Sequence, residues 1–200
     1  MSLTASTMLP LGTPAPNFDL PDPSGRHYRL SDFADRRLLL VMFICNHCPF
    51  VQHIREALAN FAREYQEQGV GIVAINSNDI VTHPQDAPHR MAAEAERFGY
   101  GFPYLFDESQ EVAKSYMAAC TPDFFLFDKS RQLVYRGQFD GSRPDNGTPT
   151  TGCDLRSAVD QLFAGETVGV DQTPSIGCNI KWKAGNEPDY ISLTQRPARS

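Results

Sequence analysis

Two cysteines lie three positions apart in the sequence, Cys45 and Cys48, with Asn46 and His47 between them. Two thiols at this spacing fit one helical turn, so they can close a disulfide with little movement of the backbone. A helix N-terminus lowers the pKa of a thiol, because its free N–H groups and partial positive charge stabilise the thiolate. The spacing therefore predicts dithiol–disulfide exchange, in which Cys45 faces outward and attacks, and Cys48 sits behind it and resolves the mixed disulfide.

The segments on either side of the pair predict the elements that position it. Residues 38–44 form a continuous apolar run, which is typical of a central strand buried on both faces. After Cys48 the apolar residues recur with a helical period, and Pro49 suits the first turn of a helix. We therefore expect the dithiol at the carboxyl end of a buried strand, where the active sites of open α/β sheets lie. At that place a protonated His47 would favour the thiolate.

The rest of the chain alternates predicted strands and helices. A hairpin is predicted over residues 17–30, and the order after it is β-α-β-α-β-α-β-β-α. This order predicts an α/β domain with a central mixed sheet flanked by helices, because alternating strands pair in parallel and the last two form an antiparallel pair. We expect a flexible N-terminus over residues 1–10, one domain over residues 11–165, and an irregular C-terminal extension, residues 166–200, packed on or near the domain.

Several of these segments resemble the redoxin and AhpC/TSA-type proteins of the thioredoxin-like superfamily. The likeness covers about residues 11–163 and rests on the hairpin residues 15–20, 25 and 30–33, and on the core segments 45–48, 71–76, 102–107 and 121–128. The resemblance implies a thioredoxin-like fold with an N-terminal hairpin. It also implies a soluble thiol–disulfide oxidoreductase with Cys45 and Cys48 as its redox pair, which requires no organic cofactor and no metal.

The dipeptide Thr121-Pro122 stands where an edge of the sheet would pass the dithiol, just before the apolar residues 124–127. It resembles the cis-proline of thioredoxin-like folds, which packs against the cysteine pair while the backbone before it pairs with an extended peptide substrate. The resemblance therefore implies that Thr121 and Pro122 belong to the active site. The alternative is an ordinary trans proline that ends a helix, since only about 5–6% of X–Pro bonds in folded proteins are cis.

A thiol-dependent peroxidase, an antioxidant enzyme of the AhpC/TSA type, is one alternative function. Peroxiredoxins carry the pattern P-x-x-x-T-x-x-C up to the peroxidatic cysteine. Counted back from Cys45, the Thr and Pro positions hold Met42 and Leu38, and counted back from Cys48 they hold Cys45 and Val41. The missing pattern argues against efficient peroxide reduction by that mechanism, and a peroxide consumption assay decides the question.

A metal-handling protein, such as a copper or zinc carrier, is the other alternative. One CxxC motif supplies two ligands, whereas a structural zinc takes four, so Cys120, Cys178 or a histidine would have to complete the site. Cys178, in the extension, has three interpretations of its own: a third redox thiol, a residue that caps the active site together with Trp182, or a buried structural thiol. Closely spaced cysteines in a cytosolic chain are often catalytic, redox-sensing or metal-binding, and the strand–CxxC–helix order favours the redox interpretation.

The composition narrows the class of partner. The chain has 200 residues, 41% of them hydrophobic, and a formal net charge of -6. This mildly acidic balance gives no electrostatic reason to bind nucleic acid or an anionic membrane. Residues 1–16 contain no Lys or Arg and no long apolar run, which argues against a secretory signal. We therefore expect a cytoplasmic protein whose partners are disulfide- or dithiol-containing proteins or small thiols, and the oligomeric state stays open.

Overall fold

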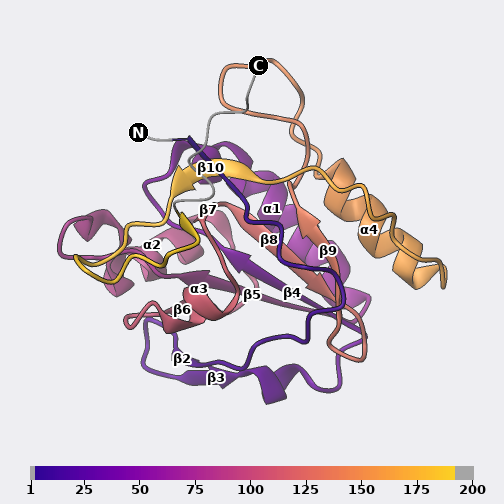
Figure 1. Ribbon diagram of the computed structural model, residues 1–200, viewed down its shortest axis with the longest axis horizontal. Helices are drawn as coiled ribbons and strands as arrows, with labels where there is room; N and C mark the ends of the chain where they lie inside the picture. Colours follow the sequence, from indigo (N-terminus) through magenta and orange to yellow (C-terminus); the bar gives the residue numbers. More distant parts are fainter. Residues whose placement is uncertain (1–2, 192–200) are drawn as a thin grey trace.

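A computed structural model describes residues 3–191, and its centre is a five-stranded sheet (Figure 1). In the order in which they pair, the strands are β6 (Tyr104–Phe106), β5 (Val70–Asn76), β4 (Leu38–Phe43), β8 (Asp123–Phe127) and β9 (Leu133–Gly137). β4, β5 and β6 are parallel, whereas β8 runs antiparallel to β4, and β9 runs antiparallel to β8. The predicted mixed sheet and the thioredoxin-like α/β fold are confirmed.

Other elements cover both faces of this sheet, as predicted. The core on one face takes side chains from three helices: α1 (Pro49–Glu67), α2 (Pro88–Phe98) and α4 (Cys153–Phe163). The core on the other face takes side chains from one short helix and from the N-terminal hairpin: α3 (Glu111–Ser115), β2 (Asp19–Pro21) and β3 (His27–Arg29). Two short 3-10 helices, η1 (Leu30–Phe33) and η2 (Pro84–Asp86), complete the connections.

The apolar run of β4 is buried along its whole length because the sheet is covered on both sides. Side chains alternate between the two faces of a strand. Leu40 and Met42 therefore belong to the core beneath α1, and Leu39, Val41 and Phe43 belong to the core beneath α3. A substitution in β4 thus disturbs one core or the other, and no position of the strand is open to solvent.

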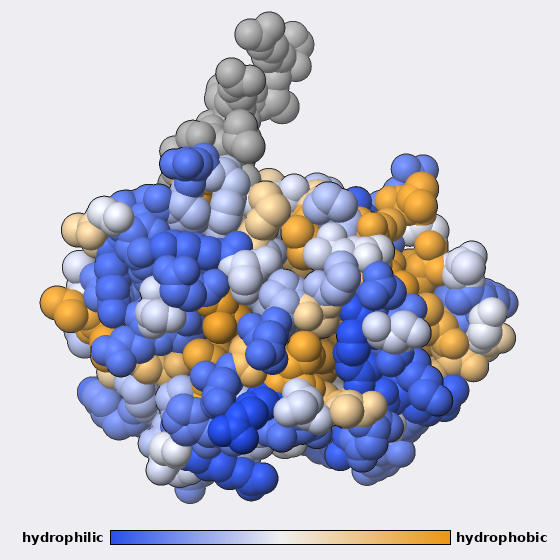
Figure 2. Space-filling view, turned by 60° about the horizontal axis from the view of Figure 1, so that its bottom comes forward, coloured by the Kyte–Doolittle hydropathy of each residue, from blue (hydrophilic) through white to orange (hydrophobic). Residues whose placement is uncertain are grey.

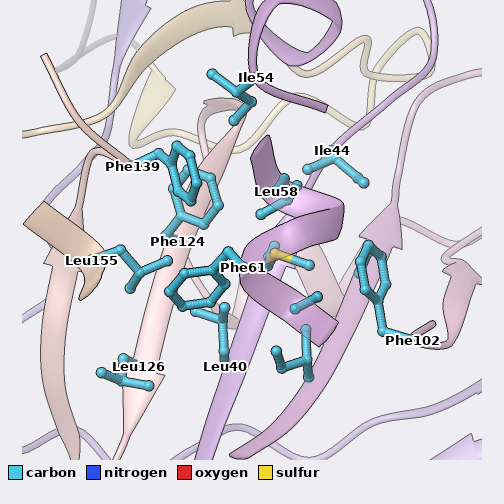
Figure 3. Packing of buried hydrophobic residues seen from close by; sticks show 14 of the residues in the cluster. Leu40, Ile44, Ile54, Leu58, Phe61, Phe102, Phe124, Leu126, Phe139 and Leu155 are labelled. Atoms are coloured by element: carbon cyan, nitrogen blue, oxygen red, sulfur yellow. The ribbon is translucent and has the colours of Figure 1, made fainter. Parts of the chain in front are cut away.

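α1 is held against the sheet by one apolar face. Ile54, Leu58 and Phe61 recur on that face and point toward the strands (Figure 3). The ring of Phe61 meets Phe139 edge-on at 5.8 Å between centroids, and Phe139 stacks on Phe124 of β8 at the same distance. This packing fixes the N-terminus of α1 at the carboxyl end of β4.

A second, three-stranded sheet joins the two ends of the chain. It consists of β1 (Leu3–Ala5), β10 (Ile176–Asn179) and β7 (Cys120–Thr121), with β10 in the middle and antiparallel to both neighbours (Figure 1). The sequence predicts a flexible segment over residues 1–10 and an irregular extension over 166–200, but the structure has a strand in each. The prediction missed them because such short strands carry no periodicity and their partners are distant in the sequence. Residues 1–2 and 192–200 lie outside the described part of the chain.

The surface shown in Figure 2 is largely hydrophilic, and its hydrophobic side chains lie in small groups between polar ones. Among the helices of residues 3–191, none combines the length and apolar character needed to cross a membrane.

Candidate active site

Cys45 and Cys48 lie at the carboxyl end of β4, as the sequence predicts, and both are buried. Cys48 is the N-cap residue of α1, and the exposed fractions of Cys45 and Cys48 are 1% and 0%. The prediction that Cys45 faces outward is therefore wrong. Its sulfur is covered because Thr121 and His47 lie against it, and Cys178 of the extension lies against Cys48.

Thr121 lies beside both thiols. The Thr121-Pro122 peptide bond is cis, as predicted. The hydroxyl oxygen of Thr121 is 3.4 Å from Cys45 Sγ, and its carbonyl oxygen is 3.1 Å from Cys48 Sγ. Because Thr121 belongs to β7, and β10 pairs with the edge of β7, the extension forms one wall of the site.

His47 is paired with a carboxylate that is not predicted from the sequence. Its Nδ1 lies 2.6 Å from Oδ2 of Asp86 and 3.9 Å from Cys45 Sγ. Asp86 is fully buried and also accepts hydrogen bonds from the backbone N–H groups of Asn46 and His47 and from the side-chain amide of Asn78. Burial opposes ionisation of Asp86, but these hydrogen bonds outweigh it and hold its pKa below the usual value.

The pKa values of the two thiols are shifted in opposite directions. Burial raises the pKa of Cys45 well above 9.0, and its hydrogen bond to Cys48 and the negative charge of Asp86 raise it further. Hydrogen bonds from Cys178 and Cys45 to the sulfur of Cys48 lower the pKa of Cys48, and burial opposes them without cancelling them. As a thiol, Cys48 can donate to the carbonyl oxygen of Thr121, but the bonds that it accepts as a thiolate outweigh this one.

These directions favour ionisation of Cys48 over Cys45, whereas the sequence assigns the attack to Cys45. The start of the helix adds to the bonds from Cys178 and Cys45. α1 starts at Pro49, so its N-cap is the second cysteine, and the backbone N–H of Val51 in the first turn also lowers the pKa of Cys48.

The other three cysteines have different surroundings. Cys178 lies on β10 with 2% of its surface exposed. Cys120 is also buried, but its Sγ points to the carbonyl oxygen of Pro122 at 3.6 Å. Cys153 is exposed at the start of α4. Only Cys178 of these three makes a hydrogen bond with the dithiol among the described residues.

Sequence analysis missed Asp86 because the loop that carries it looks like an ordinary connection between strand and helix. The loop is anchored to the dithiol turn by several bonds: the side chain of Asn46 donates to the carbonyl oxygen of Gln85, and the backbone N–H groups of Asn46 and His47 donate to Asp86. The only local sign of this contact is Asn46, which lies between the two cysteines and whose side chain can both donate and accept hydrogen bonds.

Replacing the carboxylate beside Cys45 is expected to make that thiol easier to ionise. In a Cys48→Ser background, Asp86→Asn removes a negative charge from the neighbourhood of Cys45, so the pKa of Cys45 should fall. The pH dependence of alkylation by iodoacetamide measures it. Asp79→Asn is the matched control, because Asp79 lies in the same loop and bonds Val81 and Thr82 instead. An unchanged midpoint in Asp86→Asn would contradict the electrostatic coupling.

Gly177→Ala is expected to loosen the wall that β10 forms. A Cβ at Gly177 would lie 2.0 Å from the carbonyl oxygen of Thr121, so β10 and β7 must move apart at a cost of roughly 1–3 kcal/mol. The buried thiols should then react with a small alkylating agent at least about tenfold faster at 25 °C. Gly169→Ala is the control, because its new methyl group meets no described atom within 4 Å. Equal alkylation rates in both variants would show that β10 does not limit access.

A dithiol at a helix N-terminus, facing a cis-proline at the end of a mixed sheet, places this chain among the thioredoxin-fold dithiol proteins. Comparison with known sequences adds the family. The sequence profile of the AhpC/TSA family matches residues 11–136, and the chain belongs to that family.

The relatives include functionally named and unnamed proteins. The thiol-disulfide oxidoreductase ResA of Geobacillus thermodenitrificans is 32% identical over 130 residues, 65% of this chain and 70% of that protein. The crystal structure of a hypothetical protein from Sinorhizobium meliloti has a TM-score of 0.90 and 58% identity, covering 91% of this chain and all of that one. The thioredoxin domain of a thiol-disulfide oxidoreductase from Bacteroides vulgatus has a TM-score of 0.60 at 19% identity, covering 77% of this chain and 98% of that domain, and shows the fold alone.

Proposed function

We propose that this protein exchanges the Cys45–Cys48 dithiol with disulfide- or dithiol-containing proteins or small thiols. The activity is that of a thiol–disulfide oxidoreductase, the name that its relatives ResA carry. The observation that carries the proposal is the position of Cys48 at the N-cap of α1, where the thiol of Cys45 donates a hydrogen bond to its sulfur. As its place of action we propose the cytoplasm, where a dithiol such as Cys45 and Cys48 is kept reduced.

The exchange follows from which sulfur carries the charge. The thiolate of Cys48 attacks one sulfur of a substrate disulfide, forming a mixed disulfide and releasing one substrate thiolate. Cys45 then transfers its proton to that leaving thiolate and attacks the sulfur of Cys48. A Cys45–Cys48 disulfide forms, and the second substrate thiolate leaves. Two electrons have passed from the dithiol to the substrate, and the reverse sequence oxidises a substrate dithiol.

The neighbouring residues have supporting roles in this proposal. The hydroxyl of Thr121 lies within reach of Cys45 Sγ, and the carbonyl oxygen of Thr121, which precedes the cis bond to Pro122, faces Cys48 Sγ. His47 lies between Asp86 and Cys45, so a protonated imidazole offsets the carboxylate charge as a thiolate forms at Cys45. We assign Thr121, Pro122 and His47 to the active site on these contacts.

A metal-binding function has one observation in its favour. A ligand atom from each of Cys45, His47 and Asp86 lies within 4.8 Å of the others. Three donors fall short of the four that a structural zinc takes, and the Nδ1 atom of His47 is already occupied by Asp86. Metal binding is therefore the second candidate.

Redox titration separates these functions. Purified protein is equilibrated with glutathione buffers of defined potential, alkylated and analysed by mass spectrometry, and its metal content is measured on the same sample. Reversible two-electron oxidation of a metal-free protein supports dithiol exchange, and its midpoint gives the direction of electron flow. A dithiol that does not oxidise, or that stays blocked by one equivalent of metal, would favour metal handling. If the protein consumed hydrogen peroxide with a higher turnover than it reduces glutathione disulfide, the peroxidase function would be favoured.

A further inference from the structure

The C-terminal extension brings a third cysteine to the dithiol. β10 pairs with β7 so that Cys178 stands directly opposite Thr121. Opposed Cα atoms in an antiparallel pair are about 4.5–5.5 Å apart. Because the carbonyl oxygen of Thr121 is itself 3.1 Å from Cys48 Sγ, this register places Cys178 beside Cys48. The side chains of Cys178 and Cys48 are hydrogen-bonded and share one buried cluster with Cys45.

The close approach of the extension is built into its sequence. Gly177 precedes Cys178, and a Cβ at Gly177 would meet the carbonyl oxygen of Thr121 at 2.0 Å. Only glycine therefore allows β10 to pack this tightly on β7. On its other side β10 is covered by β1, where Leu3 stands opposite Cys178. If the extension served only to cover the core, its backbone would not need to come this close to the carbonyl oxygen of Thr121 at the edge of β7.

We propose that Cys178 is a third redox thiol of this site, which resolves mixed disulfides at Cys48 in competition with Cys45. The inference rests on the proposed function and adds a residue to it. After Cys48 has attacked a substrate disulfide, Cys178 gives up its proton to the released substrate thiolate and attacks the sulfur of Cys48. A Cys48–Cys178 disulfide forms, and the second substrate thiolate leaves, so the same two electrons reach the substrate.

The two possible disulfides have different structural consequences. Cys45–Cys48 lies within one turn of the chain and forms no covalent link to β10. Cys48–Cys178 links the N-terminus of α1 covalently to β10, because Cys48 is the N-cap of α1 and Cys178 belongs to β10. The second disulfide therefore locks the extension over the site and leaves Cys45 reduced, whereas the first leaves the extension free to move.

The test uses the full-length Cys45→Ser variant, in which Cys45 cannot compete. Reduced protein is treated with glutathione disulfide, quenched with acid, alkylated, digested with trypsin without reduction, and analysed by mass spectrometry. Cys48 falls in the tryptic peptide 38–55 and Cys178 in 157–181, whereas Cys120 falls in 115–129. We expect peptide 38–55 linked to 157–181, and a glutathione adduct at Cys48 that disappears at least about tenfold faster than in Cys45→Ser/Cys178→Ala. The control is Cys45→Ser/Cys120→Ala, which removes a different buried thiol, that of Cys120. This control should behave like Cys45→Ser.

The outcomes separate this inference from the proposed function. If wild-type protein reduces glutathione disulfide but Cys45→Ser retains its adduct and forms no link to 157–181, Cys178 is not a redox thiol, and the two-cysteine exchange stands. If the wild type itself neither reduces glutathione disulfide nor acquires an adduct, the proposed function falls as well. A link from 157–181 to Cys45 in Cys48→Ser, but none to Cys48 in Cys45→Ser, would overturn the assignment of Cys48 as the partner.

Discussion

Cys48→Ser is expected to abolish nearly all thiol–disulfide exchange at pH 7, with a loss of about a thousandfold or more, in the range seen when an enzyme loses its nucleophile. The reason is the distribution of charge between the two thiols. Hydrogen bonds from Cys178 and Cys45 lower the pKa of Cys48, whereas burial and Asp86 raise that of Cys45. Without Cys48 the site holds almost no thiolate at neutral pH.

The pH dependence follows from the same shifts. A thiol with a lowered pKa is ionised throughout the neutral range, so alkylation of Cys48 in wild-type protein should be nearly independent of pH between about 6 and 8. In Cys48→Ser the remaining Cys45 has a raised pKa, so its alkylation rate should rise about tenfold per pH unit over that range. Iodoacetamide kinetics with mass spectrometry of peptide 38–55 measure both.

Two further variants complete that experiment. Cys45→Ser should keep a reactive Cys48 whose alkylation is nearly independent of pH, and Cys153→Ser should match the wild type because Cys153 lies exposed on α4. If Cys48→Ser retained a pH-independent alkylation while Cys45→Ser lost it, the attacking sulfur would be Cys45, and the charge assignment made from the structure would be wrong.

Asp123→Asn is expected to stabilise the protein at alkaline pH by up to about 4 kcal/mol. Asp123 follows the cis-proline at the start of β8 and is fully buried. Within residues 3–191 neither carboxylate oxygen has a partner in hydrogen-bonding geometry, although the hydroxyl groups of Ser6 and Ser175 lie close enough to favour its ionised form partly. Burial dominates and raises the pKa of Asp123 from 3.8 to about 7.

The sign of the change in stability follows from the protonation state of Asp123 that the folded protein favours. The folded protein favours the neutral acid, whereas an unfolded chain ionises it above pH 3.8. The contribution of Asp123 to stability is therefore largest below about pH 4, falls as the pH rises toward 7, and stays low above it. The amide of Asp123→Asn is uncharged throughout, so its advantage should be largest at pH 8 and small at pH 4.

Urea unfolding of reduced protein at pH 4.5 and pH 8 measures the difference. Asp35→Asn is the control, because that carboxylate is 81% exposed and its replacement should change the free energy of unfolding by less than about 0.5 kcal/mol at either pH. An equal effect of Asp123→Asn at both values of pH would show that Asp123 carries no raised pKa in the fold.

Local patterns in the sequence determined the scaffold of the site. The apolar run of residues 38–44 predicts a strand buried on both faces, and β4 is such a strand. The helical period after Cys48 predicts α1, and Pro49 opens it. These predictions succeed because periodicity and turn chemistry are properties of neighbouring residues. The cis bond before Pro122 was also predicted, although from a family resemblance and not from its own local sequence.

Only the tertiary structure decided which sulfur carries the charge and what surrounds it. Asp86 reaches His47 from a loop 39 positions away, and Cys178 reaches Cys48 through strand pairing with β7. The pKa of a buried thiol depends on such neighbours and on the depth of burial, and neither is encoded in the spacing of two cysteines. For the same reason the sequence predicted an outward-facing Cys45, whereas packing of β7 and β10 encloses it.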